Sequence, residues 1–283
     1  MSRQDQDRRA RRWSVAQRLD FAANRLFWDG TLQREDIIAR FGVSPAQATS
    51  DLSALRARLG EAIRYDISRR SYVPGSRFGT PPADAGRLLA ELRLIAEGVM
   101  EAGDGVLANP PPTEIAGQLV RSVDPEVLRA VLWAIRDAQA LLADYVSFQR
   151  PEVTRRKLSP HALVFDGFRW HMRAHDAEDG RFKDFVLSRL SAVGIDGPAV
   201  ETEKNDADWA RWLCLQIAPH PGLTKHQQAV VRLDYNMGQT MLELPVRAAV
   251  EFYARKRLGL VEGHENRPAK EQQIVLVGCH PMR

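Results

Sequence analysis

Residues 167–176 read Gly-Phe-Arg-Trp-His-Met-Arg-Ala-His-Asp, and this stretch decides the fold of the middle of the chain. Turn signals flank it, Asp166-Gly167 before and Asp179-Gly180 after, which predicts two consecutive β-hairpins. The side chains of a strand alternate between its faces. One face therefore carries Arg169, His171, Arg173 and His175, and the other carries Trp170, Met172 and Ala174. We expect the apolar face to enter a core and the basic face to receive an anionic ligand.

Further strand-like runs surround this stretch. Residues 143–149 alternate polar and apolar side chains, 152–157 form a polar run, and 159–165 lead into the first turn. Residues 181–190 continue after the second turn. Five short strands at this close spacing predict a small, strongly bent sheet or an SH3-like barrel.

The composition is that of an ordinary globular protein. The chain has 283 residues, of which 44% are hydrophobic and 27% charged, so we expect two or three domains. No run approaches the roughly 18 apolar residues of a membrane span, and the Arg-rich start lacks the apolar stretch of a secretory signal. Cys214 and Cys279 form no disulfide framework, which predicts reduced thiols and a cytoplasmic location.

The positive charge is concentrated at the start of the chain. Residues 1–78 contain 15 arginines and no lysine against 9 acidic residues, a net charge of +6. The remaining 25 basic residues face 27 acidic ones, a net charge of −2. A basic segment on a near-neutral body is typical of a nucleic-acid partner, although a solvated basic tail would look the same.

The same basic segment has the pattern of a winged helix-turn-helix. Helical spacing of apolar residues begins at Trp13 and ends at Asp29-Gly30, and a short helix is predicted over 33–41. After the turn 42–44, Ser44 is a good N-cap and Pro45 suits the first helical position. The helix that follows ends at Gly60, and two strand-like runs then form a wing.

The third helix of such a module lies in the major groove of DNA. Its outward side chains are small or polar; Gln47 could read adenine, and the hydroxyl groups could reach bases or phosphates. Two arginines at the tip of the wing are placed for the DNA backbone. The predicted DNA-binding residues are Ser44, Pro45, Gln47, Thr49, Ser50, Arg69 and Arg70. A protein-docking role for the same module is the alternative.

The elements after the wing are a mixture of helices and strands. Helices are predicted around 88–99 and over 125–142. From about residue 206, strands are predicted at 212–217 and 273–278, with helices at 224–231 and near 246–258. This last segment reads as a small α+β domain.

Several motifs together resemble one family. Trp170-His171-Met172 stands where WYL-domain regulators carry Trp-Tyr-Leu, and Tyr145-x-Ser147, Ser159-Pro160-His161 and Phe185-x-Leu187-x-Arg189 flank it as in that family. The chain resembles the BrxR and CapW type of WYL regulator from bacterial phage-defence islands, whose recognition helix and C-terminal extension are similar too. Pro219-His220-Pro221-Gly222 resembles part of that extension. His171 and Met172 are departures from the parent signature.

This resemblance implies an organisation and a ligand site. The expected α+β multidomain fold has a winged helix-turn-helix domain at 1–78, a helical linker region at 79–142, an SH3/Sm-like barrel WYL domain at 143–200 and a C-terminal dimerisation domain at 201–283. Guanidinium groups from several strands, with hydrogen-bonding and aromatic groups, would bind an anionic nucleotide or nucleic-acid end. The expected ligand-binding residues are Tyr145, Ser147, His161, His171, Arg173 and Arg189. A solvated sheet face with ordinary salt bridges is the alternative.

Metal binding and catalysis find little support in the sequence. On a strand, His171 and His175 would lie about 13 Å apart, too far for one ion, and we expect no metal and no cofactor. No motif of hydrolases, phosphate loops or metalloproteases occurs. The prediction is therefore a homodimeric repressor of a defence or stress locus that binds an inverted repeat and answers an anionic signal. An activator of the same design, and a nucleic-acid-processing enzyme that docks through the winged module, remain open.

Overall fold

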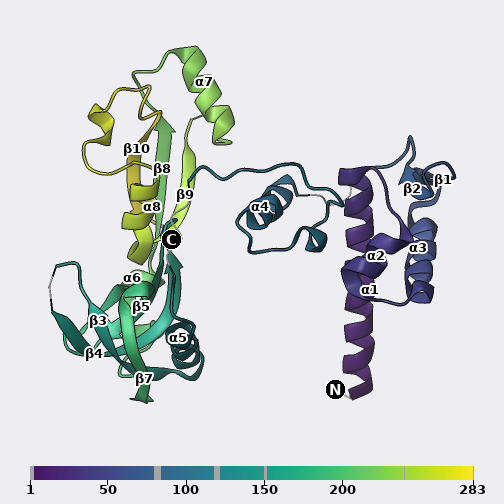
Figure 1. Cartoon of the computed structure of the whole chain (residues 1–283). Helices are drawn as coiled ribbons and strands as arrows, with labels where there is room; N and C mark the ends of the chain where they lie inside the picture. Colours follow the sequence, from purple (N-terminus) through teal and green to yellow (C-terminus); the bar gives the residue numbers. More distant parts are fainter. Residues whose placement is uncertain (1–2, 80–83, 118–121, 150–151, 239, 283) are drawn as a thin grey trace. The chain divides into compact units, whose positions relative to one another are not determined.

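The structure is a computed structural model that describes residues 3–79, 84–117, 122–149, 152–238 and 240–282 (Figure 1). It divides into two compact units, Met1–Gln118 and Leu119–Arg283. Among the described residues, no helix is both long enough and apolar enough to span a membrane.

The first unit begins with the predicted winged helix-turn-helix. Its elements are α1 (Arg3–Asp29), α2 (Arg34–Phe41), α3 (Pro45–Leu59), β1 (Ile63–Asp66) and β2 (Ser71–Pro74). β1 and β2 pair antiparallel as the wing. Leu32, between α1 and α2, exchanges two backbone hydrogen bonds of 2.9 Å with Tyr72 and so ties the wing to the helices. The predicted order of elements is confirmed.

An apolar core fixes the three helices against the wing. Leu26 of α1, Ile37 of α2, Leu55 of α3 and Ile63 of β1 are buried in one cluster. The turn between α2 and α3 depends on Gly42, whose φ of 61° lies in the left-handed region. The core and the turn together set the orientation of α3 on the module.

The rest of the first unit is a short helical segment. α4 (Ala85–Ala96) is capped by Asp84 and contributes no fully buried residue. The segment is held to the helices by polar contacts: the Ala108 N–H donates to Asp29 at 2.7 Å, and Arg40 pairs with Asp104 at 3.2 Å. Contacts of this kind at a surface are individually weak.

The second unit starts with α5 (Pro125–Asp137) and an antiparallel five-stranded sheet. The sheet order is β6-β5-β4-β3-β7, with β3 (Gln139–Val146), β4 (Val153–Phe165), β5 (Trp170–Asp176), β6 (Arg181–Val186) and β7 (Leu190–Pro198). The predicted bent set of strands is present, but the hydrogen-bonded order is open, with β6 and β7 at its edges. Closure into a barrel is not confirmed.

α5 ends earlier than the sequence predicts. Ala138 adopts a left-handed conformation with φ 48°, and residues 139–142 continue as strand β3 instead of helix. α5 lies against one face of the sheet (Figure 1). Its residues Val127, Val131 and Ala134 are buried in the core that it shares with the strands. The sequence placed this helix in the linker region; its packing favours assigning it to the sheet domain.

β5 has the predicted alternation of faces, with one correction. Met172 and Ala174 are fully buried in the core beneath α5. Trp170 does not join them, because its position at the first residue of β5 leaves it 48% exposed, with its ring against Phe165. The opposite face, with His171 and Arg173, is buried as well and not solvated.

The C-terminal part of the second unit is built on a three-stranded antiparallel sheet in the order β10-β8-β9. Its strands are β8 (Trp212–Pro219), β9 (Leu242–Arg247) and β10 (Ile274–Pro281), and its helices are α6 (Ala207–Ala210), α7 (Lys225–Asp234) and α8 (Glu251–Arg257). Leu215 and Leu260 lie at the centre of its core. The helix predicted near 246–258 is shorter than expected, since residues up to 247 form β9.

Short 3₁₀ turns complete the chain at Gly60–Ala62, Ala102–Asp104, Leu187–Arg189, Glu203–Asn205, Ala248–Val250 and His264–Asn266.

Candidate nucleic-acid interface and ligand site

The N-terminal turn of α3 carries the residues expected to meet DNA. Ser44 caps the helix, its hydroxyl oxygen accepting from the Gln47 N–H at 3.2 Å, and Pro45 occupies the first turn. Ser44, Pro45, Thr49 and Ser50 are exposed. The Thr49 hydroxyl donates to the Pro45 carbonyl at 2.9 Å, which leaves its oxygen free to accept. This face is open and polar, as close approach to base edges requires.

Gln47 is held in place by a buried ion pair. Its amide nitrogen donates to Asp51 at 3.0 Å, and Asp51 in turn receives two hydrogen bonds from Arg18 of α1 at 2.5 and 3.1 Å. Arg18 and Asp51 are both buried. The Gln47 amide keeps its carbonyl oxygen and a second N–H, the two groups that a bidentate contact with adenine uses. The sequence did not reveal this support of Gln47 by α1.

The wing tip presents the two predicted arginines. Arg69 and Arg70 are exposed, and Arg70 has a positive φ of 50°. Asp66 orders the turn by accepting from the Ser68 N–H at 2.9 Å and the Arg69 N–H at 3.1 Å. No salt bridge engages either guanidinium group within the described residues. Both are therefore available for phosphates.

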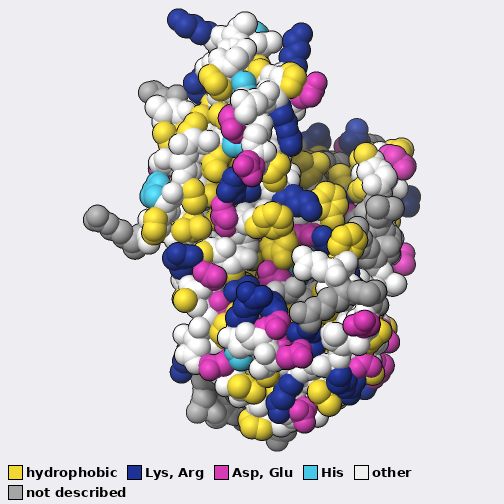
Figure 2. All heavy atoms as spheres, turned by 90° about the vertical axis from the view of Figure 1, so that its left-hand side faces the viewer, with side chains coloured by type: hydrophobic (Ala, Val, Ile, Leu, Met, Phe, Trp, Pro, Cys, Tyr) yellow, Lys and Arg dark blue, Asp and Glu magenta, His cyan; other side chains and the backbone are white. Residues whose placement is uncertain are grey.

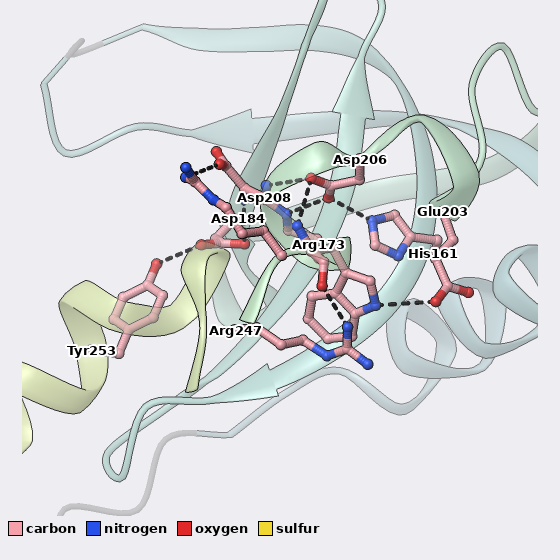
Figure 3. A network of polar contacts seen from close by, with 10 residues as sticks. His161, Arg173, Asp184, Glu203, Asp206, Asp208, Arg247 and Tyr253 are labelled. Atoms are coloured by element: carbon pink, nitrogen blue, oxygen red, sulfur yellow. Dashed lines mark hydrogen bonds and ion pairs between the residues drawn. The ribbon is translucent and has the colours of Figure 1, made fainter. Parts of the chain in front are cut away.

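On the second unit, the buried face of β5 centres on Arg173 (Figure 3). Its guanidinium group forms a bidentate pair with Asp206, the N-cap of α6, at 2.7 and 2.9 Å. A third hydrogen bond of 3.3 Å goes to Asp184 of β6. The side chains of Arg173 and Asp206 are 7% and 1% exposed. The planar fork that could bind an external anion is already filled by carboxylates of the same chain.

Residues from β4, β5 and α8 complete this network. His161 of β4 contacts the Asp206 carboxylate at 3.0 Å through Nε2, and the Tyr253 hydroxyl of α8 donates to Asp184 at 3.0 Å (Figure 3). The His171 ring lies 4.8 Å from the Tyr253 ring. The network therefore joins the five-stranded sheet to α6 and α8 of the C-terminal part.

The charges of the network stabilise one another. Burial alone would raise the pKa of the Asp206 carboxyl, but hydrogen bonds from Arg173, the Trp209 N–H and His161 hold its pKa below the ordinary value. For Arg173, burial works against the charged form, and Asp206 and Asp184 outweigh it and raise its pKa. Burial, and then the neighbouring Asp184 charge, raise the pKa of Tyr253. The Arg173–Asp206 pair is therefore ionised at neutral pH.

A second polar cluster lies at the β4–β5 turn. Asp166 accepts from the Phe168 and Arg169 N–H groups at 2.8 Å each, and it contacts His171 Nε2 at 2.9 Å. Burial acts against its charge, but these hydrogen bonds prevail and lower its pKa well below the ordinary value. Among the described residues, three buried ring nitrogens have no hydrogen-bond partner: Nδ1 of His161, of His171 and of His175.

The structure divides the expected ligand residues into two groups. His161, His171 and Arg173 share the network just described. Tyr145 lies on the other face in the core beneath α5, with its hydroxyl 3.4 Å from the Val186 N–H. Ser147 accepts from the Gln149 N–H just beyond β3, and Arg189 lies over the Phe148 ring at 6.0 Å. These last residues do not reach the Arg173 network.

The acidic partners of Arg173 were missed from the sequence. Asp206 is 33 residues away from Arg173 and belongs to another part of the fold. Its only local signal is that of a helix N-cap, which predicts a start of α6 and no contact with the sheet. No group of three or more His, Cys, Asp or Glu side chains in the described part of the chain could hold a metal ion.

Three family models match the chain in order. The BrxR transcriptional regulator winged helix-turn-helix domain matches residues 14–86, the WYL domain matches 126–195, and the BrxR transcriptional regulator C-terminal dimerization domain matches 212–280. The WYL match begins inside α5, in agreement with the packing of that helix. These segments together define a WYL-domain transcriptional regulator of the BrxR type.

Curated relatives narrow the class further. The DNA-binding transcriptional repressor CapW of Stenotrophomonas maltophilia is 35% identical over 88% of this chain and 84% of that protein. CapW repressors of Escherichia coli and Pseudomonas aeruginosa are 31% and 30% identical to this chain. Each alignment covers 95% of this chain and 91% of the relative. The chain belongs to the CapW family. The solved proteasome accessory factor B/C of Arthrobacter aurescens matches at 19% identity and a TM-score of 0.26, over 79% of this chain and 41% of that one.

Proposed function

We propose that this protein is a homodimeric DNA-binding transcriptional repressor that reads an inverted repeat through α3 and the wing. The observation that carries the proposal is the exposed polar N-terminal turn of α3, with Gln47 braced by Asp51 and Arg18. Relatives named as DNA-binding repressors and the matched C-terminal dimerization domain support it. Paired recognition helices of a dimer suit half-sites about one helical turn apart.

The finer part of the proposal concerns the signal. The repressor controls a phage-defence or stress locus and is released by an anionic nucleotide or nucleic-acid ligand at the WYL domain. Such a ligand can act at Arg173 only by competing with Asp206 for the guanidinium fork. Displacement of Asp206 would loosen α6 from the sheet. A ligand shifts the protein between two states only if it prefers one of them, and replacement of the Asp206 carboxylate by the ligand's phosphate supplies such a preference.

Electrophoretic mobility shift with the DNA upstream of the protein's own gene tests the repressor assignment. We expect a discrete shifted band that survives an excess of random duplex at moderate salt, because specific complexes are about a thousandfold or more tighter than non-specific ones. Transcription from that promoter in vitro should fall as the protein is added. Equal affinity for random duplex, or a rise in transcription, would contradict the proposal.

A further inference from the structure

A pocket lined by aromatic and basic side chains lies beside the Arg173 network, between the β4–β5 turn and α8. Its volume is about 250 Å³, and it is lined by Asp166, Phe168, Arg169, Phe252, Tyr253, Lys256 and Arg257. Gly167 allows the close approach of the two elements: it has a φ of 96°, and a Cβ there would lie 3.1 Å from the Arg257 side chain. Three aromatic rings and three cations meet at one opening.

Two of the three aromatic rings of this pocket are largely exposed. Phe168 is 70% exposed and Phe252 61% exposed. They come from different elements, one from the hairpin turn and one from α8. On the face drawn in Figure 2, hydrophobic side chains are interspersed with Lys and Arg side chains and do not form one continuous apolar surface. Exposed rings beside cations are typical of surfaces on which nucleobases stack.

The cations of the pocket have unused charge. Lys256 follows Phe252 by one helical turn and lies over its ring at 6.0 Å. Within the described residues, no carboxylate lies within salt-bridge distance of Lys256 or Arg257. Arg169 is paired with Asp166, whose carboxylate already accepts from backbone N–H groups and His171. The pocket therefore offers an anion two uncompensated positive charges.

We propose that this pocket binds one nucleotide of a single-stranded nucleic acid, with the base stacked on Phe168 and Phe252 and the phosphate held by Lys256 and Arg257. The volume admits a single base and its sugar, so the rest of the strand lies outside. The site is separate from the Arg173 fork. The inference rests on the proposed function only in taking the signal to be derived from nucleic acid.

Fluorescence anisotropy of the full-length protein with a short oligo(dT), labelled at its 3′ end, tests the pocket. The double variant Phe252→Ala/Lys256→Ala should lower the affinity about tenfold or more, since one stacked base and one phosphate contact are lost. The matched control is Trp133→Ala/Lys225→Ala, which removes an exposed ring of α5 and an exposed lysine of α7. This control should stay within about twofold of the wild type.

Competitors identify what is bound. An abasic oligomer of the same length should compete poorly. If it competed as well as unlabelled oligo(dT), the site would bind through phosphate charge alone, and the proposal would be overturned. Competition by free dTMP would assign a mononucleotide, and competition by oligo(dT) alone would assign a strand; either supports the pocket. Equal oligo(dT) affinity of wild type and double variant overturns it.

Two further measurements separate this pocket from other roles. Size-exclusion chromatography with light scattering should give the double variant the mass of the wild type; a monomer would make the α8 surface a subunit contact and sink the proposal. Operator binding by the double variant in the absence of oligo(dT) should equal that of the wild type. If the wild type itself fails to bind its operator specifically, the proposed repressor function fails, whereas the oligo(dT) result still decides the pocket.

Discussion

At the scale of single residues, the decisive pair is Arg173 and Asp206. The sequence predicts that Arg173 and His171 share a basic face, and period-two alternation is sufficient for that inference. It does not reveal that the chain supplies its own anions. The partners of Arg173 come from β6 and from the start of α6, and contacts between distant segments leave no periodic signal. Arg173 forms salt bridges within the chain, and these pairs are buried and not solvated.

Removing one partner of this buried pair should cost much more than removing a surface carboxylate. Asp206→Ala leaves the Arg173 charge buried beside Asp184 alone, and we expect the free energy of unfolding to fall by about 3 kcal/mol. Urea denaturation of the full-length protein measures it. Asp208→Ala is the matched control, because Asp208 lies on the same helix and pairs with Arg211 at 2.9 Å on the surface. Its effect should stay within about 0.5 kcal/mol; equal losses in both variants would show that the buried pair contributes no more to stability than a surface pair.

At the scale of elements, helices were easier to predict than the sheets. Leu52 and Leu55 of α3 fall on one helical face by spacing alone, and Ser44 with Gly60 marks both ends. The sequence predicts a helix through Leu142 because Leu142 continues the spacing of Val131 and Ile135, although it belongs to β3. Short apolar runs do not distinguish helix from strand. Trp170 was assigned to the core from alternation, which cannot show that a strand has just begun there.

Substitutions in the recognition helix and in the wing should affect DNA binding in different ways. Gln47→Ala removes a group placed to read a base, so it should weaken specific binding by about 1–3 kcal/mol and relax preference at one position of each half-site. Arg69→Ala/Arg70→Ala removes phosphate contacts, so it should weaken binding to all duplexes alike. The slope of log K against log salt concentration should become less steep by about one for each arginine.

Mobility shifts with operator variants over a range of salt concentrations measure both effects. Arg64→Ala is the control, as Arg64 is an exposed arginine of β1 away from the wing tip. Uniform weakening by Gln47→Ala across all sequences would contradict its role in reading bases.

At the scale of the whole molecule, α8 connects two sites. Tyr253 lines the aromatic–basic pocket, and its hydroxyl also donates to Asp184, which holds Arg173. A single-stranded nucleic acid bound in the pocket would therefore lie one side chain away from the network that joins the five-stranded sheet to α6. Both sites lie where the sheet domain packs against the C-terminal part. A ligand that prefers one packing would change how the dimer presents its two winged helix-turn-helix domains to DNA.

The dimer also sets a geometric condition on the operator. Two recognition helices held by one dimer reach half-sites about one helical turn apart on the same side of the duplex. Inserting five base pairs between the half-sites turns one of them to the opposite side of the duplex, and we expect the affinity to fall toward that for a single half-site, about a hundredfold or more. An insertion within a sequence that lies outside both half-sites is the control and should change nothing. Full affinity after the five-base-pair insertion would mean that the two winged helix-turn-helix domains bind independently. A ligand could then not control DNA binding by changing the distance between the two recognition helices.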